Sequence, residues 1–357
     1  MENSIKLGVI QKLIEDPDVS EIMVNSCSKV FVERNGKKTD AGVKFSSDQE
    51  IFELIDRIFG SAGKRVDSDL PYGDICLSDG TRVNAIIPPL ARFGPTLTFR
   101  KFSKAIAHLD DLIKSGTLTR RSADLLIGCV RGRVNMVFSG GTGVGKTTLL
   151  QMLSQYFSPD ERIIVIEDAA ELKFTQQNTV SLETRTPDKD NKGGVSIRDL
   201  IRNSLRMAPD RLVIGEVRGG EAIDMLQAMA TGHSGTIGIV HGNSPKDVIS
   251  RLETMVLMSG VELPLWEVRK LIASTINLIV HLERLQDGSR RVTYVTEIRG
   301  VEKDEILLNN LFVFHFEGMD DKGKIVGKLR PTIRYYPLFF QAFQKMGLLD
   351  KDIFVDG

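Results

Sequence analysis

Residues 134–150 read VNMVFSGGTGVGKTTLL and place an apolar strand-like run, a glycine-rich turn and an apolar-periodic helix in direct succession. The turn, residues 140–147, fits the pattern G-x4-G-K-[ST] in full. Glycines let backbone N–H groups converge on phosphate oxygens, and the N-terminus of the following helix adds a favourable dipole. Because strand and helix stand in the order that the pattern requires, the segment predicts a site for nucleotide phosphates.

Individual residues of this loop have separate chemical tasks. Lys146 is placed to neutralise the β- and γ-phosphates, and the Thr147 hydroxyl is placed to bind Mg²⁺. We therefore expect ATP and Mg²⁺ as cofactors of a Mg²⁺-dependent ATPase. The residues expected to contact the nucleotide from this loop are Gly141, Thr142, Gly143, Val144, Gly145, Lys146, Thr147 and Thr148.

Helix and strand patterns alternate around the loop. Helical spacing of apolar residues covers 112–130, 147–157, 195–206 and 221–231. Strand-like runs cover 134–138, 163–166, 212–214 and 236–240. The alternation predicts an α/β fold with a mostly parallel sheet and helices on both of its faces.

The first hundred residues follow a different pattern. Short strand-like runs at 21–33, a hairpin at 74–89 and a strand at 94–102 surround one helical segment at 49–59. This mixture indicates a smaller α+β domain, and a length of 357 residues suits two domains. We expect an N-terminal domain over 1–105, a linker over 106–113 and a motor domain over 114–357 that ends in a helical part.

Acidic residues follow two of the predicted strands at the end where ligands gather in an open α/β sheet. Glu167 and Asp168 come just past the strand at 163–166, and Glu216 closes the run DRLVIGE at 210–216. Carboxylates at that edge can hold Mg²⁺ through water or orient an attacking water. A solvated cap at a strand end is the alternative interpretation of each acid.

Two of the five histidines lie close together in the sequence, His233 in TGHSG and His241 in VHGNSP. His241 ends the apolar strand at 236–240, where a polar group can hydrogen-bond the γ-phosphate and report its loss to the neighbouring loop. A structural histidine at a strand end is an equally good interpretation. No cysteine or carboxylate stands at metal-ligand spacing from either histidine, so a zinc site is not expected.

Arginines at 198, 202 and 206 repeat at helical spacing and form one basic stripe. Solvent exposure is the default expectation for such a stripe, because arginine is seldom buried unpaired. The sequence alone gives the stripe no function.

Charge and cysteine content bound the class of protein. Lys+Arg and Asp+Glu are both 47, which disfavours nucleic-acid binding through bulk positive potential, and no nucleic acid is expected as a partner. The cysteines at 27, 76 and 129 form no CxxC pair and favour a reducing cytoplasm. The N-terminus lacks a signal-peptide pattern and no apolar stretch is long enough to span a membrane, so we expect a soluble protein.

Four segments in order resemble the motor of the secretion ATPase superfamily, which powers type II secretion, type IV pili and type IV secretion. They are SGGTGVGKTTLL (139–150), IEDAAEL (166–172), RMAPDRLVIGEVRGGEA (206–222) and TGHSG (231–235) followed by VHGNSP (240–245). They are similar to the Walker A, Asp box, Walker B and His box of that superfamily. VSLETRTP, IIPPLARFGPTLTFRKF and IMVNSCSKVFVERNGK resemble its CpaF/TadA branch, the tight-adherence (Flp) pilus ATPases.

The resemblance implies a RecA-like motor domain and a hexameric ring with each nucleotide between the N-terminal and motor domains. It makes Glu167 the water-activating base and Glu216 the Walker B acid near Mg²⁺. His233 and His241 become the His-box residues. The absence of a four-cysteine cluster separates the chain from superfamily members that carry a zinc subdomain.

The resemblance also implies roles for two arginines outside the four boxes. Arg100 matches the strand that presents an arginine to the phosphates from the N-terminal domain. Arg185 is a candidate for stabilising charge from an adjacent subunit, since arginine suits the charge that develops in phosphoryl transfer. One departure is Gly242, where the family more often has alanine after the histidine.

The function that the resemblance predicts is a cytoplasmic motor at the inner face of the cell membrane. Its ATP hydrolysis would drive assembly of a tight-adherence pilus through platform proteins of the inner membrane, with retraction left open. A conjugation-class type IV secretion ATPase shares all four boxes and is the alternative. A nucleic-acid translocase is disfavoured by the zero net charge, and a non-hydrolysing nucleotide-gated scaffold would require the acids to be idle.

Overall fold

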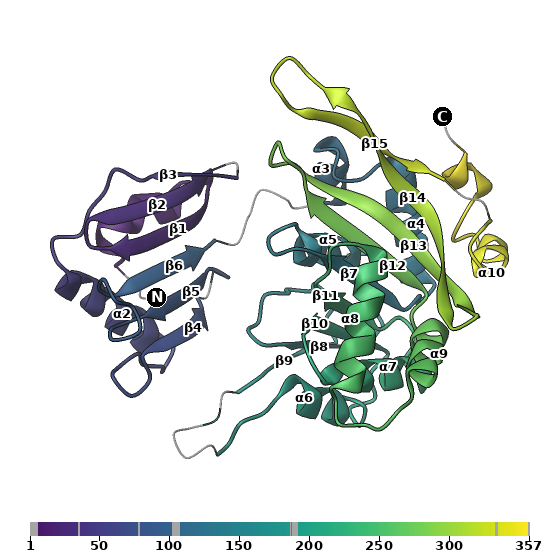
Figure 1. The fold of residues 1–357 in the computed structure, drawn as a ribbon, viewed down its shortest axis with the longest axis horizontal. Helices are drawn as coiled ribbons and strands as arrows, with labels where there is room; N and C mark the ends of the chain where they lie inside the picture. The colour runs from purple at the N-terminus through teal and green to yellow at the C-terminus, as the bar shows by residue number, and fades with distance from the viewer. Residues whose placement is uncertain are drawn as a thin grey trace. The chain divides into compact units, whose positions relative to one another are not determined.

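The computed structural model describes residues 6–34, 36–77, 79–101, 108–185, 187, 192–332 and 335–355. The chain forms two compact units, Met1–Ile106 and Ala107–Gly357 (Figure 1). The predicted linker over 106–113 overlaps helix α3 (Leu109–Lys114), which therefore corrects its C-terminal limit. The helix begins this early because the Asp111 carboxylate accepts a hydrogen bond from the His108 main-chain N–H at 3.0 Å, which caps its first turn.

The N-terminal unit is a six-stranded antiparallel sheet in the order β3-β2-β1-β6-β5-β4. Its strands are β1 (Val19–Ser26), β2 (Lys29–Arg34), β3 (Lys37–Asp40), β4 (Tyr72–Cys76), β5 (Arg82–Ile86) and β6 (Thr96–Arg100). Its helices are η1 (Gly8–Ile10), α1 (Gln11–Glu15) and α2 (Asp48–Ser61). The apolar side of α2, with Ile51, Leu54 and Ile58, packs into the core of this unit, as the helical spacing at 49–59 predicts.

The larger unit contains a nine-stranded sheet in the order β15-β14-β13-β12-β7-β11-β10-β8-β9. Its strands are β7 (Met136–Gly140), β8 (Ile163–Glu167), β9 (Thr179–Glu183), β10 (Arg211–Val217), β11 (Ile237–Val240), β12 (Leu278–Arg284), β13 (Arg290–Glu302), β14 (Glu305–Met319) and β15 (Ile325–Pro331). From β12 to β9 every neighbouring pair is parallel, whereas β13, β14 and β15 are antiparallel.

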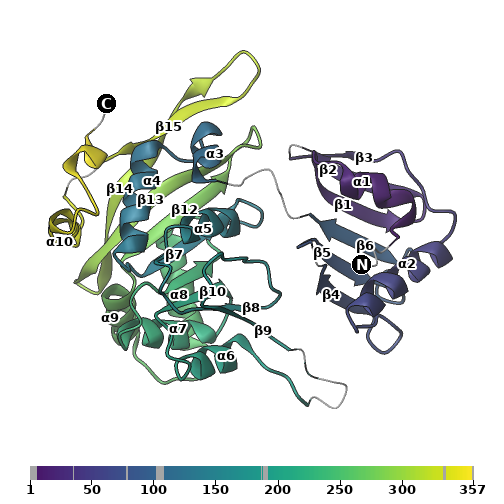
Figure 2. The same cartoon turned by 180° about the vertical axis from the view of Figure 1, so that it is seen from behind.

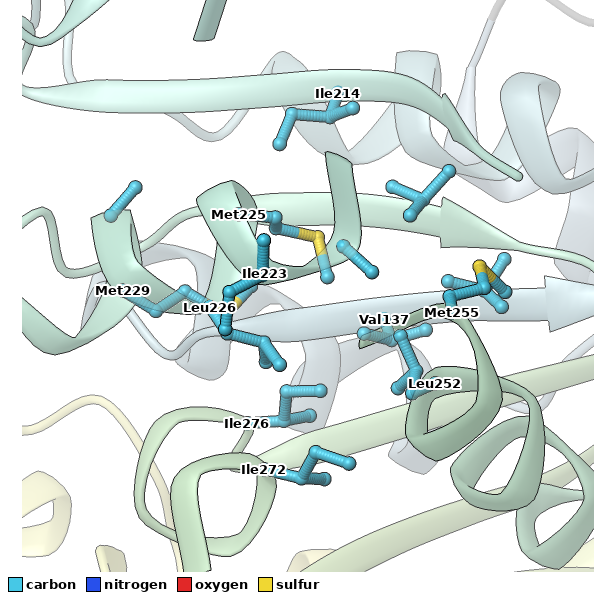
Figure 3. Packing of buried hydrophobic residues seen from close by; sticks show 14 of the residues in the cluster. Val137, Ile214, Ile223, Met225, Leu226, Met229, Leu252, Met255, Ile272 and Ile276 are labelled. Atoms are coloured by element: carbon cyan, nitrogen blue, oxygen red, sulfur yellow. The ribbon is translucent and has the colours of Figure 1, made fainter. Parts of the chain in front are cut away.

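Helices cover both faces of this sheet, as predicted. They are α3, α4 (Arg120–Arg131), α5 (Lys146–Ser154), α6 (Ile197–Ser204), α7 (Glu221–Ala230), α8 (Pro245–Leu257), α9 (Leu265–Thr275), α10 (Phe340–Lys345) and η2 (Lys351–Phe354). On one face, Val137 and Ile214 pack against helix residues such as Met225 and Leu252 (Figure 3), in a cluster that also contains Ile164. On the other, α4 and α5 lie together beside β7; α8 stands in front of the sheet in Figure 1 and α4 in Figure 2.

Two of the expected elements need correction. The helical pattern at 112–130 is two helices, α3 and α4, separated at Gly116, whose φ of 72° ends the first, and Thr119, which caps the second. The expected helical C-terminal part is mainly the antiparallel strands β13 to β15, followed by the short α10 and η2. Register shifts in these strands interrupt the two-residue alternation that identifies a strand in a sequence.

Two arginines of the basic stripe, Arg198 and Arg202, share one partner, although Arg202 and Arg206 are exposed as expected. Asp224, on α7, is 4% exposed and its carboxylate accepts hydrogen bonds from Arg198 Nε and Arg202 Nε, both at 2.7 Å. Arg198 also donates to the main-chain carbonyl of Ser259 at 3.2 Å. Two members of the stripe therefore clamp α6 to α7 through a single buried carboxylate.

Removing the charge of that carboxylate is expected to destabilise the larger unit. Asp224→Asn loses one of its two charge-assisted hydrogen bonds and removes the carboxylate charge that both arginines contact, at a cost of about 1–3 kcal/mol. Urea denaturation followed by circular dichroism measures the change. The exposed Glu262→Gln is the matched control, and equal midpoints for the two variants would contradict the clamp.

Candidate nucleotide site

The glycine-rich loop leaves the sheet at the carboxyl end of β7. Gly140, Gly143 and Gly145 have φ of 137°, 72° and 101°, a region that favours glycine. A Cβ on Gly140 would lie 2.1 Å from the main-chain oxygen of Leu282, so no other residue fits there. The glycines of the motif are therefore required by the backbone of the loop itself.

The helix that follows the loop offers main-chain donors to a ligand. Helix α5 begins at Lys146, and the N–H of Leu149 bonds the carbonyl of Gly145 at 2.9 Å as the first helical turn closes. The N–H groups of residues 146–148 precede that bond and have no acceptor within the helix. With residues 141–143 exposed, this first turn fits the phosphates of a nucleotide.

Lys146 is the cation of the loop and is only 7% exposed. Its Nζ donates to the main-chain oxygens of Gly140 at 2.9 Å and Gly141 at 2.6 Å. Burial lowers the pKa of Lys146 to about 8, against the opposing charges of Glu216 and Glu171. Phosphate oxygens are stronger acceptors than the two carbonyls, so we expect the ammonium group to exchange these carbonyls for phosphate oxygens when a nucleotide binds.

The lowered pKa predicts a pH-dependent affinity for ATP. Below pH 8 the Lys146 side chain is already protonated, whereas above it ATP binding must take up a proton because the bound phosphates raise this pKa again. Affinity is expected to fall about tenfold for each pH unit above 8. Calorimetry at pH 9 in two buffers of different ionisation enthalpy measures the uptake; Lys146→Ala should show none, and zero uptake by the parent would contradict the prediction.

Two of the predicted site residues meet at the carboxyl edge of the sheet. Glu216 on β10 and His241 just after β11 are brought together because the two strands are parallel neighbours, and His241 Nε2 lies 2.8 Å from Glu216 Oε1. The other oxygen, Oε2, accepts from Arg218 Nη2 at 2.5 Å. Arg218 was not singled out in the sequence, although it stands two residues after Glu216.

The charges around this pair set its protonation state. Burial raises the pKa of Glu216, but Arg218, His241 and Lys146 outweigh it and hold that pKa below its usual range. Burial and the nearby Lys146 lower the pKa of His241. The pair is therefore a carboxylate beside a neutral imidazole at neutral pH, close enough to Lys146 for each charge to act on the other.

The acids after β8 have different environments. Glu167 is 4% exposed, and its Oε1 accepts from the main-chain N–H of Glu171 at 3.1 Å and of Leu172 at 3.2 Å. A Cβ on Gly215 would lie 2.7 Å from Glu167 Cγ, so the glycine makes room for this carboxylate. Glu171 is partly exposed, and its charge acts on Lys146. Glu167 thus holds the loop that places the charge of Glu171 near Lys146. The sequence analysis did not identify Glu171 as a candidate.

His233 does not lie with the other predicted site residues of its own chain. Strand β11 is parallel to β7 with Ile237 opposite Met136, so residues before Ile237 lie at the edge where β7 begins. The phosphate loop leaves the opposite edge, about 13 Å away at the rise of a β-strand. There the main-chain N–H of His233 bonds the carbonyl of Ala228 at 3.3 Å. Within its own chain His233 therefore lies in a turn at the edge opposite the phosphate loop, and its expected catalytic role stays a prediction.

The two predicted arginines have contacts within their own units. Arg100, at the end of β6, pairs with Glu21 through Nε and Oε1 at 2.7 Å. Arg185, after β9, donates from Nε to the main-chain oxygen of Gly193 at 2.5 Å and is exposed. Their action on a nucleotide remains a prediction.

A buried histidine beside the phosphate loop was also missed. His281, on β12, is 1% exposed and its Nδ1 lies 2.8 Å from the Ser139 hydroxyl, one residue before the loop. It is flanked by apolar residues in LIVHLER, and a lone polar residue in an apolar run was the available signal.

The residues fit a magnesium ion held mostly by water and phosphate. Among the described residues no three His, Cys, Asp or Glu gather at one point. Magnesium in phosphate sites takes only one or two protein oxygens, and Thr147 in the first turn of α5 with Glu216 at the end of β10 suits that arrangement.

The described part of the chain contains no helix long and apolar enough to cross a bilayer.

Comparison with known families agrees with these features. The model of the family "Type II/IV secretion system protein" matches residues 3–314. The chain belongs to this family. Family and site together make it a secretion-system ATPase.

Relatives of this secretion ATPase carry names of the conjugation class. The putative conjugal transfer protein Rv3659c of Mycobacterium tuberculosis is 33% identical over 301 residues, 83% of this chain and 85% of its own. The conjugal transfer protein TrbB of Rhizobium radiobacter is 32% identical over 80% of this chain and 86% of its own. The type IV secretion system protein PtlH of Bordetella pertussis is 34% identical over 80% and 91%. These names favour the conjugation-class alternative over the tight-adherence branch.

Solved structures show the same fold. The pilus retraction motor PilT with bound ADP superposes with a TM-score of 0.56 at 19% identity, over 98% of this chain and 91% of its own. The ATPase DotB of Legionella pneumophila gives 0.56 at 18% identity, over 83% and 80%. The predicted fold of a P-loop motor domain after a smaller N-terminal domain is confirmed.

Proposed function

We propose that this secretion ATPase hydrolyses ATP with Mg²⁺ and drives a membrane-embedded machine of the conjugation or type IV secretion class. One observation supports hydrolysis most strongly: the phosphate loop, the Glu216–His241 pair and the loop with Glu171 come together at one edge of the sheet. The names of the relatives support the class of machine.

The chain's own groups divide the work of binding. Lys146 exchanges the carbonyls of Gly140 and Gly141 for the β- and γ-phosphates, and the N–H groups of residues 146–148 hold the phosphate chain. Thr147 and Glu216 would hold the Mg²⁺, partly through water. When bound, this ion neutralises charge on the β- and γ-phosphate oxygens.

Hydrolysis needs a carboxylate that reaches the attacking water. Glu171 suits this role better than Glu167, because Glu171 is partly exposed and its charge acts on Lys146. Glu167 is buried, and both of its oxygens accept main-chain N–H bonds within its own loop. We assign Glu167 to positioning that loop and Glu171 to orienting and deprotonating the water. Neutral His241 is placed to exchange its bond with Glu216 for one with the γ-phosphate and so to report phosphate loss.

A ring of subunits completes the proposal. We propose a homohexamer, peripheral to the membrane on its cytoplasmic side, in which Arg100 and Arg185 act on a nucleotide bound by this or a neighbouring chain. The resemblance of the four boxes to a hexameric superfamily supports it. An arginine at the boundary between two subunits of the ring would stabilise the negative charge that develops during phosphoryl transfer.

A second candidate machine is a tight-adherence pilus. The segments 22–37, 86–102 and 180–187 resemble that branch of the superfamily. Crosslinking the tagged chain in membranes of cells that produce it, followed by mass spectrometry, separates the two. Capture of a secretion-channel component supports the conjugation class, whereas capture of pilus platform proteins alone would replace it with the second candidate.

A further inference from the structure

The hairpin of β12 and β13 lies directly against the phosphate loop. Strand β12 pairs in parallel with β7, with His281 opposite Ser139 and Leu282 opposite Gly140. The Leu282 main-chain oxygen approaches Gly140 so closely that a Cβ would not fit between them. The chain of β12 therefore continues past the start of the loop, and the turn into β13 follows two residues later, after Arg284.

The turn is held in one conformation by hydrogen bonds. The N–H of Leu285 bonds the carbonyl of Ser289 at 2.8 Å, and Asp287 Oδ1 accepts from the N–H of Ser289 at 3.0 Å and from its hydroxyl at 2.7 Å. Asp287 Oδ2 accepts from the N–H of Ile325 at 2.8 Å, which ties the turn to β15. These bonds therefore hold the first residue of β13 in a fixed position.

Arg290 is that residue. Its Cδ lies 3.8 Å from the position that a Cβ on Gly145 would occupy, so the stem of the side chain runs beside the phosphate loop. The side chain is exposed, and its guanidinium begins one bond beyond Cδ. The next residue, Arg291, points elsewhere and donates from Nη1 to the main-chain oxygen of Ser115 at 2.5 Å.

Position in the loop indicates which part of a nucleotide Arg290 would meet. The N–H groups of a phosphate loop cradle the α- and β-phosphates, whereas its lysine reaches the β- and γ-phosphates. Gly145 stands immediately before Lys146 in this cradle. A guanidinium is planar, always charged and suited to bidentate pairing with phosphate oxygens.

We propose that Arg290 is a further nucleotide-binding residue that pairs with the phosphates common to ATP and ADP, from a hairpin outside the four sequence boxes. The proposal rests on the proposed function, because it concerns the same site. The β12–β13 hairpin would then be the third part of the chain to contribute to that site, after the phosphate loop and the acidic edge of the sheet. Since ADP retains these phosphates, the contribution of Arg290 survives hydrolysis and slows release of the product.

Equilibrium binding of ATP and ADP, each with Mg²⁺, tests the proposal on the full chain. Arg290→Ala is expected to weaken both nucleotides about tenfold, which corresponds to about 1.4 kcal/mol, and Arg290→Lys is expected to recover part of the loss. Arg291→Ala is the matched control and should leave both affinities unchanged. Thermal unfolding of each variant shows that the comparison is made on folded protein.

Three results would overturn the proposal. Affinities of Arg290→Ala equal to those of the parent would remove Arg290 from the site. If Arg290→Ala lost affinity for ATP but not for ADP, Arg290 would contact the γ-phosphate instead. If the parent itself bound neither nucleotide and Lys146→Ala behaved in the same way, the proposed function would fail, and that outcome is distinguishable from the other two.

Discussion

Glu171→Gln is expected to reduce single-turnover ATP hydrolysis by about 100-fold or more, the usual contribution of a general base. The amide cannot accept the proton of the attacking water, whereas it has nearly the same size and keeps the loop in place. Because Glu171 is not among the groups that hold the phosphates, the affinity for ATP should change little. Rapid-quench measurements at saturating ATP, with affinity determined separately, provide both quantities.

Glu167→Gln is the matched comparison and should behave differently. Its carboxylate accepts two main-chain N–H groups in a buried position, so the amide would face one of them with a donor of its own. We expect a lower unfolding temperature and a smaller loss of activity than for Glu171→Gln. If Glu167→Gln lost all hydrolytic activity while Glu171→Gln stayed active, Glu167 would be the base, which is the role that the family resemblance implies for it.

Arg211→Ala is expected to destabilise the larger unit by about 3–5 kcal/mol. Arg211 is fully buried, its Nε and Nη2 donate to Glu161 at 2.8 and 3.1 Å, and its guanidinium lies 4.2 Å above the ring of Phe157. Two further N–H groups donate to main-chain oxygens of Gly235 and Val130. Removing the arginine leaves the Glu161 carboxylate buried beside the half-exposed Arg133, whose Nε lies 3.0 Å from Glu161 Oε1.

A double variant separates the loss of the ion pair from the loss of packing. Arg211→Met with Glu161→Leu removes both charges and keeps apolar volume, so it should be much more stable than Arg211→Ala alone. Urea denaturation of the three proteins gives the free energies of unfolding. A destabilisation of less than about 1 kcal/mol in Arg211→Ala would show that this network adds little, as exposed ion pairs do.

The sequence predicts best what depends on neighbouring residues in the chain. The phosphate loop requires glycines at fixed spacing, and the approach of Leu282 to Gly140 shows why. Alternating strand and helix patterns gave the parallel sheet, and the order of parallel strands then brings Glu216 and His241 together. These features follow from local pattern and from the common edge at which parallel strands end.

Features that depend on distant partners were not predictable in the same way. Asp224, on a different helix, pairs with two arginines of the largely exposed stripe and so joins α6 to α7. The choice between Glu167 and Glu171 depends on the path of a short loop. His233 belongs to a segment that resembles the family's His box, but in its own chain it lies at the edge opposite the phosphate loop. Arg290 reaches the loop only because β12 is a neighbour of β7.

Mg²⁺-ATP hydrolysis by the parent and by Lys146→Ala, measured over a series of protein concentrations, tests whether the phosphate loop is the site of hydrolysis in a ring of subunits. We expect the specific activity of the parent to rise as subunits assemble and Lys146→Ala to have no activity at any concentration. Activity that survives in Lys146→Ala would contradict the assignment of the phosphate loop as the site of hydrolysis. Parent activity that does not depend on concentration, in a range where the oligomer dissociates, would contradict the ring.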